Sequence, residues 1–292
     1  MKTIDILIVL FVVIVWGVSF SAIKIGLEEL PPILFSALRF AIVAFPAIVF
    51  VPFPRHLAWQ VLGVGFFLGV VKFSLLFIGM KAGTSAGLAS LLLQAQVFFT
   101  IVLSIFLFKE TINRLQLVGI IIAASGFTLF FINTNIAVGS SNVTVTGLIL
   151  ILMAALAWAI SNLIMKKALD IDLLKFMVWA SAIPPIPLII LSYLFETNNP
   201  LQLVSQISPK SWGAIAYVGF ISTLLAFALW GKLLSSYSAA TVTPFALLIP
   251  VAGMLTSYLV FNESLNSIEV IGCLLVMLGL LCSVLHKTIQ RS

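Results

Sequence analysis

Charged side chains are scarce in this sequence. Only 8% of the 292 residues are charged, 62% are hydrophobic, and the mean hydropathy is +1.26. Soluble globular domains carry about 25% charged residues, because water must solvate their surfaces. The composition therefore excludes a soluble domain and predicts an integral membrane protein.

Residues suited to metal, redox or acid–base chemistry are also rare. The chain has two histidines, His56 and His286, and two cysteines, Cys273 and Cys282, which lie nine positions apart in the last apolar run. No HExxH motif, pair of intramembrane aspartates or glycine-rich phosphate-binding loop is present. We therefore expect no disulfide, metal, cofactor or direct use of ATP, and an intramembrane enzyme is the disfavoured alternative.

Carboxylates are missing from the middle of the apolar runs. All nine lie near run ends or in loops: Asp5, Glu28, Glu29, Glu110, Asp170, Asp172, Glu196, Glu263 and Glu269. A proton or sodium site at the membrane midplane usually includes a buried carboxylate. We therefore expect facilitated diffusion or exchange, or coupling through groups that the sequence does not identify.

Ten apolar runs are long enough to cross a membrane, since a bilayer core of about 30 Å needs about 20 helical residues. The predicted helices are 5–26, 33–53, 58–80, 84–108, 114–133, 145–166, 174–195, 212–235, 239–261 and 267–286. The predicted fold class is an all-α integral membrane protein with ten transmembrane helices. The first run lacks the short apolar core and cleavage site of a signal peptide, so we expect it to be retained.

Basic residues are concentrated on alternate loops. If the N-terminus is cytoplasmic, the external loops hold only Lys81 and Lys210. The cytoplasmic side then holds Lys2, Arg55, Lys109, Arg114, Lys166, Lys167, Lys175, Lys232, Lys287 and Arg291. This bias follows the positive-inside rule and predicts a multi-pass protein with both termini in the cytoplasm. The net charge of +6 therefore reports orientation, and nucleic acid is not an expected partner.

Two local matches relate the halves of the chain. VWGVSFSAIK (15–24) aligns with AWAISNLIMK (157–166), and FKETINRLQLVG (108–119) aligns with FNESLNSIEVIG (261–272). The offsets are 142 and 153 residues, and the longer loop at 196–210 accounts for the difference. We therefore predict two five-helix repeats, 1–136 and 145–288, with opposite orientations in the membrane. Such inverted repeats are typical of secondary transporters, although two fused copies could also form a static scaffold.

The matches also pair individual residues. Lys24 matches Lys166, at the ends of the first and sixth helices, and both are expected to anchor those ends. Glu110 matches Glu263, and both are expected to cap the helices that follow them. Two further pairs are Gly119 with Gly272 and Gly126 with Gly279.

The sequence resembles the EamA family of the drug/metabolite transporter superfamily over essentially its whole length. The resemblance is carried by VWGVSF (15–20), PPILFSALRF (31–40), KETI (109–112) and NESL (262–265). It implies a ten-helix basket with alternating access around a central cavity.

Three further segments are similar to bacterial O-acetylserine and cysteine exporters of that family: 38–51, 86–101 and 247–254. This similarity implies an inner-membrane exporter of small amino-acid-type metabolites. A broad-specificity exporter with a non-amino-acid substrate is the alternative. Whether the chain is a monomer or a dimer stays open.

Two basic residues lie inside predicted helices. An intramembrane charge is costly and usually functional, so Arg39 and Lys72 are expected to attract a substrate carboxylate. Arg39 could instead point outward or pair with Glu28 or Glu29. Lys72 could instead lose its proton.

Matched faces of the first and sixth helices supply further candidates. Trp16, Ser19 and Phe20 lie together on one helix, and Trp158, Ser161 and Asn162 lie together on the other. We expect these six residues to line the substrate site through hydrogen bonds and contacts between aromatic rings and an ammonium group. The small residues of these faces, such as Ser19 and Ser161, could instead allow the helices to pack closely.

Residues of the fourth and ninth helices complete the candidate site. Gln94 and Gln96 lie about 200° apart on a regular helix, so we expect one, Gln94, to line the cavity. Pro244 and Pro250 each remove a backbone donor and are predicted to kink the ninth helix or act as hinges.

Overall fold

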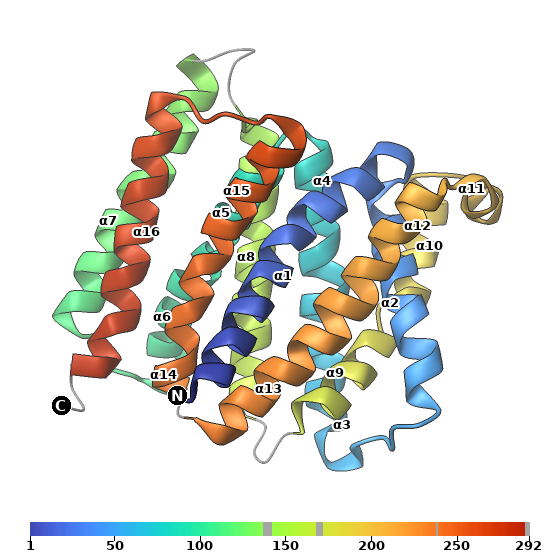
Figure 1. Ribbon diagram of the computed structural model, residues 1–292, viewed down its shortest axis with the longest axis horizontal. Coiled ribbons are helices and arrows are strands. Elements are labelled where there is room, and N and C mark those ends of the chain that lie inside the picture. The colour runs from blue at the N-terminus through green and yellow to red at the C-terminus, as the bar shows by residue number, and fades with distance from the viewer. Residues whose placement is uncertain (137–141, 168–171, 238, 290–292) are drawn as a thin grey trace.

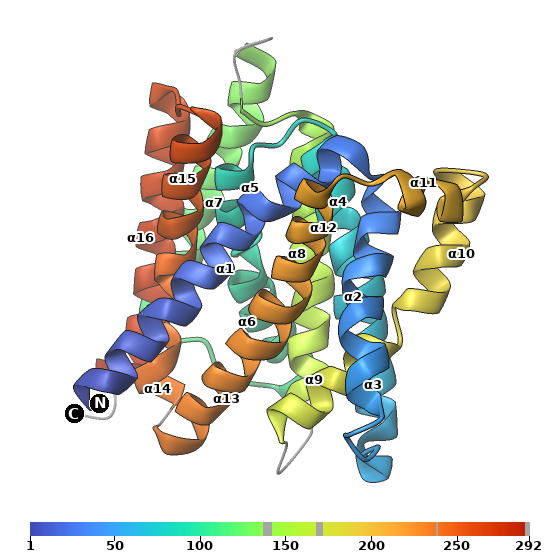
Figure 2. The same ribbon diagram turned by 45° about the vertical axis from the view of Figure 1, so that its right-hand side comes forward.

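The computed structural model describes residues 1–136, 142–167, 172–237 and 239–289, and these residues form helices joined by short loops (Figures 1 and 2). The first half contains α1 (Thr3–Glu29), α2 (Pro32–Ile48), η1 (Arg55–Leu57), α3 (Ala58–Val64), η2 (Gly65–Lys72), α4 (Phe73–Lys81), α5 (Ala86–Leu92), α6 (Ala95–Phe108) and α7 (Arg114–Ile136). The second half contains α8 (Val145–Lys166), α9 (Leu173–Ala182), α10 (Pro185–Phe195), α11 (Pro200–Gln206), α12 (Pro209–Ala216), η3 (Tyr217–Leu225), α13 (Ala226–Ser236), α14 (Ala239–Val242), η4 (Thr243–Leu247), α15 (Leu248–Phe261) and α16 (Ser267–Ile289).

Within the described residues, nine helical stretches are long and apolar enough to span a membrane, and α2 is a shorter apolar helix of 17 residues. The ten-helix fold class is therefore confirmed. Figure 1 places the start of α1 and the end of α13 at one end of the bundle, which we call the N-terminal face, and α11 at the opposite face. Most predicted boundaries agree within a few residues. The second helix, however, ends at Ile48, five residues before the predicted end, two residues after Pro46.

Two pairs of spans are irregular at corresponding positions. The third and eighth spans each contain a stretch of π-helix, η2 and η3, which widens the turn in the middle of the membrane. The fourth span is interrupted between α5 and α6, and the ninth is interrupted at η4. Such wide turns and breaks expose backbone groups and are frequent at functional sites.

The fifth and tenth spans, α7 and α16, lie side by side at one edge of the bundle (Figures 1 and 2). Their glycines allow the two backbones to touch. A Cβ atom added at Gly279 would lie 2.5 Å from the carbonyl oxygen of Gly119, and one added at Gly119 would lie 2.6 Å from the carbonyl oxygen of Gly279. Gly126 approaches the carbonyl oxygen of Gly272 in the same way. The paired glycines therefore set the distance between these helices.

Replacing Gly279 with alanine is expected to destabilise the protein by about 1–3 kcal/mol, because the new methyl group meets backbone that cannot rotate away. Gly213→Ala is the matched control, since a Cβ atom at Gly213 would have no neighbour within 4 Å. Thermal unfolding of the purified protein measures both. Equal melting temperatures for the two variants would contradict the close contact.

The matched lysines and glutamates form two symmetry-related ion pairs. Lys24 pairs with Glu263 near the opposite face, and Lys166 pairs with Glu110 near the N-terminal face. Each ammonium also lies over a matched phenylalanine ring, Lys24 at 4.3 Å from the centroid of Phe261 and Lys166 at 4.7 Å from that of Phe108. Residues that the alignment of the two halves matches therefore make equivalent contacts.

The prediction that Glu110 and Glu263 cap the helices that follow them is wrong. Asn113 accepts a hydrogen bond from the Leu115 amide at the start of α7, and its own amide donates to the Gln116 side chain. Asn266 and Glu269 make the equivalent reciprocal bonds at the start of α16. The start of α7 is therefore capped by Asn113 and Gln116, and the start of α16 by Asn266 and Glu269. Both pairs have the pattern of a capping box.

Candidate functional site

One cavity of about 330 Å³ lies in the centre of the bundle, and it is lined by side chains from both halves. All nine residues predicted to bind substrate lie on its wall: Trp16, Ser19, Phe20, Arg39, Lys72, Gln94, Trp158, Ser161 and Asn162. The structure therefore brings the candidate residues together. Their role in binding stays a prediction.

Arg39 enters the cavity from α2 and is 3% exposed. Its guanidinium carbon lies 4.0 Å from the ring centroid of Phe40 and 3.7 Å from that of Phe73, and its Nε has no hydrogen-bond partner in the described part of the chain. The alternative of a pair with Glu28 or Glu29 does not hold. Glu28 pairs with Lys210, and Glu29 accepts a hydrogen bond from the Ser208 amide.

Lys72 ends the π-helical segment η2 and is 5% exposed. Its ammonium lies 3.3 Å from the ring centroid of Phe73 and 4.8 Å from that of Trp158. Arg39 and Lys72 therefore contact the same ring of Phe73, and the described cavity wall contains no aspartate or glutamate. Two basic side chains held this close in a poorly solvated site attract an anion when both are protonated.

The two matched tryptophans have different surroundings. The Trp16 indole donates to the carbonyl oxygen of Ser222 in the π-helical segment η3, and its ring lies 5.1 Å from Trp230 and 5.3 Å from Phe227. Trp158 instead faces Lys72. Lys72 therefore lies against the face of Trp158, whereas Trp16, Phe227 and Trp230 form an aromatic wall of the cavity.

The small polar residues of the first and sixth spans differ in their bonding. The Ser19 hydroxyl donates to the Trp16 carbonyl oxygen at 2.6 Å, within its own helix. The Ser161 hydroxyl is buried without a hydrogen-bond partner in the described chain. The Asn162 amide donates to Gln96 at 2.7 Å. Ser161 is therefore the member of this group with an unused donor beside the cavity.

Gln94 and Gln96 both line the cavity, although a regular helix would point them in nearly opposite directions. The reason is the interruption between α5 and α6, which falls at Leu93 and Gln94. The Gln94 amide donates to the carbonyl oxygen of Ala246 at 3.3 Å. Pro250, four residues after Ala246, has no N–H to donate to that oxygen in a helix, and the oxygen accepts from the Leu248 amide as well as from Gln94.

Pro244 lies in the 3₁₀ turn η4, and Pro250 lies in the first turn of α15. The ninth span is divided into α14, η4 and α15, an irregularity in line with the predicted kink, because neither proline can donate to the helical ladder. Whether this break acts as a hinge stays a prediction.

The eighth span supplies cavity residues that the sequence reasoning missed. Ser222, Thr223, Phe227 and Trp230 all line the cavity. The offset of 153 that relates the second pair of segments matches the third span, which contains Lys72, with the eighth, so the sequence could have indicated that the eighth span also lines the cavity. The eighth span has Leu225 at the position that matches Lys72, and the basic residues of the described cavity wall, Arg39 and Lys72, both belong to the first half of the chain.

The cavity extends toward the N-terminal face. Its wall reaches Leu173, the first residue of α9, and Leu234 near the end of α13. Tyr237, just beyond α13, donates to Asp5 at 2.6 Å, which ties this end to the start of α1. Toward the opposite face, buried apolar packing that includes Leu27 and Phe35 lies beyond the cavity wall.

Comparisons with known proteins agree with this architecture. A family model described as the EamA-like transporter family matches residues 3–132 and 145–285. A protein named "Probable amino-acid metabolite efflux pump" from Salmonella typhimurium is 36% identical over 288 residues, covering 97% of this chain and 95% of that protein. A protein of the same name from Escherichia coli is 35% identical, covering 96% of this chain and 94% of its own. A crystal structure superposes over 100% of both chains with a TM-score of 0.65 and 17% sequence identity, a likeness of fold alone.

Proposed function

The chain belongs to the EamA-like transporter family, and from that premise we propose that it exports small amino-acid-type metabolites across a bacterial inner membrane by alternating access. The candidate substrates are cysteine, O-acetylserine and related amino acids. The names of the relatives from Salmonella typhimurium and Escherichia coli support an amino-acid metabolite as cargo.

The observation that carries the proposal is the pair of buried cations in the central cavity. Arg39 and Lys72 share the ring of Phe73 and face a described wall without carboxylates. The carboxylate of an amino acid supplies the absent negative charge, and the planar guanidinium can hold it through two parallel hydrogen bonds. The ammonium group then lies toward Trp16 and Trp230, whose faces attract cations.

The positive-inside bias supports a cytoplasmic N-terminal face. In this orientation, the cavity extends toward the cytoplasm, and apolar packing closes it from the outside. Substrate enters from the cytoplasm in this conformation. The two repeats, 1–136 and 145–288, exchange arrangements to open the other side, as inverted repeats do in secondary transporters. This cycle uses neither ATP nor enzymatic chemistry.

Transport by everted membrane vesicles tests the proposal. Vesicles that contain the chain are expected to accumulate labelled cysteine or O-acetylserine saturably, and unlabelled amino acids should compete. Vesicles prepared from cells with the empty vector are the control. Flux equal to that of the control across a broad panel of metabolites would exclude transport, and a pH jump across the membrane would report proton coupling.

A broad-specificity exporter with a non-amino-acid substrate is the second candidate. Met165 and Met177 line the cavity together with its aromatic wall, and flexible methionines suit varied apolar ligands. Competition separates the two functions. Inhibition by apolar cations but not by amino acids would favour the broad-specificity exporter, whereas the reverse pattern favours the amino-acid exporter.

A further inference from the structure

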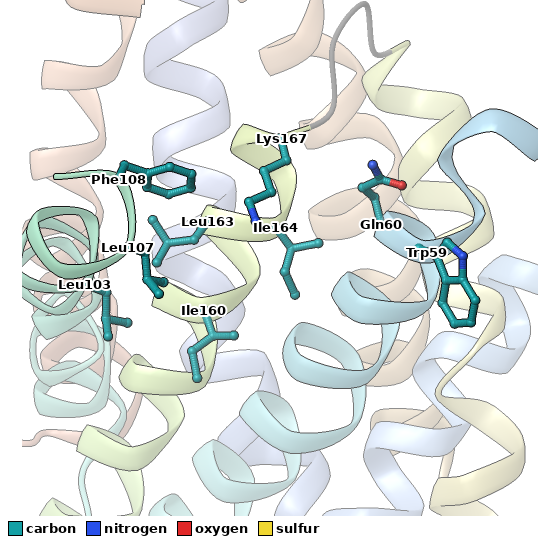
Figure 3. A pocket seen from close by; sticks show the side chains of 9 residues that line it. All are labelled: Trp59, Gln60, Leu103, Leu107, Phe108, Ile160, Leu163, Ile164 and Lys167. Atoms are coloured by element: carbon teal, nitrogen blue, oxygen red, sulfur yellow. The ribbon is translucent and has the colours of Figure 1, made fainter. Parts of the chain in front are cut away.

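A second hollow lies on the outer surface of the bundle, away from the central cavity (Figure 3). It measures about 350 Å³ and runs between α3 and α6, with α8 at its base. Trp59 on one side is 83% exposed, and Leu107 on the other is 65% exposed. Because these apolar side chains lie in membrane-spanning helices, the groove faces lipid.

The groove has one charged end. Ile160, Leu163 and Ile164 form its apolar base along α8, and Lys167 follows directly after that helix. Figure 3 shows the Lys167 side chain reaching back over α8 into the groove, with Gln60 on the facing side. Lys167 and Gln60 are the polar residues among the nine that line it.

Lys167 differs from its neighbour Lys166 in that it has no matched lysine in the other half of the chain. Lys166 has a counterpart in Lys24, and both make the same ion pair and the same aromatic contact. The counterpart of Lys167 is Ile25, so the structural role shared by the two halves does not require this second cation. Lys167 also lies over the Phe108 ring, 5.7 Å from its centroid, but no ion pair in the described part of the chain includes Lys167.

We propose that this groove binds one anionic phospholipid from the leaflet at the N-terminal face. The phosphate contacts the Lys167 ammonium and the Gln60 amide, and an acyl chain lies along Ile164 between Trp59 and Leu107. Charge complementarity identifies this occupant. A basic residue at the membrane surface attracts anionic headgroups, and an apolar groove that begins at the same depth receives the attached chain.

Native mass spectrometry of the purified full-length chain tests the site, with dioleoyl phosphatidylglycerol and dioleoyl phosphatidylcholine as probes. One phosphatidylglycerol molecule is expected to stay bound under conditions that remove phosphatidylcholine. Lys167→Gln is expected to weaken this retention about fivefold, because one lysine near the membrane surface contributes about a fivefold factor. Ile164→Trp, which fills the groove and leaves Lys167 in place, is expected to weaken retention as well.

Lys232→Gln is the matched control, since Lys232 is an exposed lysine of α13 outside the groove. It is expected to retain phosphatidylglycerol as the unmodified chain does. Equal retention by the Lys167→Gln and unmodified chains would overturn the proposal. Full competition by glycerophosphoglycerol, which has no acyl chain, would also overturn it, as would a dimer that is disrupted by Ile164→Trp and binds no lipid at this position.

Discussion

Replacing Lys72 with methionine is expected to abolish saturable export and, at the same time, to raise the melting temperature. A lysine at the centre of a membrane helix costs about 2.5–3.5 kcal/mol. Its contacts with the rings of Phe73 and Trp158 return about 0.5–2 kcal/mol. The free-energy cost of the buried lysine exceeds the stabilisation by its ring contacts. An apolar side chain of similar length should therefore stabilise the fold while it removes the attraction for a carboxylate.

Transport kinetics and thermal unfolding, measured on the same preparation, distinguish this result from a folding defect. Arg39→Met is also expected to raise the melting temperature and to raise the KM of export about tenfold or more, because a hydrogen bond to a charged group contributes about 1.5–3 kcal/mol. Lys232→Met removes an exposed lysine outside the cavity and should change neither quantity. If Lys72→Met lowers the melting temperature together with transport, Lys72 has a structural role and the proposed site is wrong.

Glu263→Gln is expected to open the cavity toward the opposite face. Glu263 pairs with Lys24 and also accepts a hydrogen bond from the Ser257 hydroxyl, and its side chain is 13% exposed. Loss of a partly buried charged contact weakens the closed arrangement by roughly 1.5–3 kcal/mol, which corresponds to at least a tenfold rise in the population of the open one. Glu110→Gln is the matched control. Its pair with Lys166 is about half exposed, and exposed pairs contribute about 1 kcal/mol or less.

Labelling of a cysteine introduced at Ile23, on the cavity wall, measures the opening. The native Cys273 and Cys282 are first replaced with alanine, and a membrane-impermeant maleimide is added to intact cells. Glu263→Gln should raise the labelling rate about tenfold. Equal rates in the Glu263→Gln and Glu110→Gln backgrounds would show that the two ion pairs do not close opposite faces.

Helical periodicity, the internal match and the intramembrane position of two basic residues were sufficient to place nine residues on the cavity wall. Trp16 and Trp158 occupy equivalent positions in matched segments, and residues three or four positions away share their face. Arg39 and Lys72 could be assigned to the cavity because an intramembrane cation has few other places to lie. The same reasoning matched Lys24 with Lys166 and Glu110 with Glu263, although the capping role predicted for the two glutamates was wrong, because both pair with the matched lysines.

Departures from the regular helix could not be read from composition. The π-helical segments η2 and η3 have no distinctive residue pattern, so the sequence did not predict them. The separation of Gln94 and Gln96 was calculated for an unbroken helix, and the break at Leu93 and Gln94 removed the basis of that calculation. Both errors arise where tertiary contacts select a local geometry that has little intrinsic preference.

The contact between the glycines of α7 and α16 has a consequence for how this architecture can diversify. None of the described cavity residues lies in α7 or α16, so the surfaces that hold the fifth and tenth helices together are separate from the surfaces that line the cavity. The lining of the cavity can therefore change through substitutions in the other eight spans, while the close backbone contacts between the fifth and tenth helices stay the same.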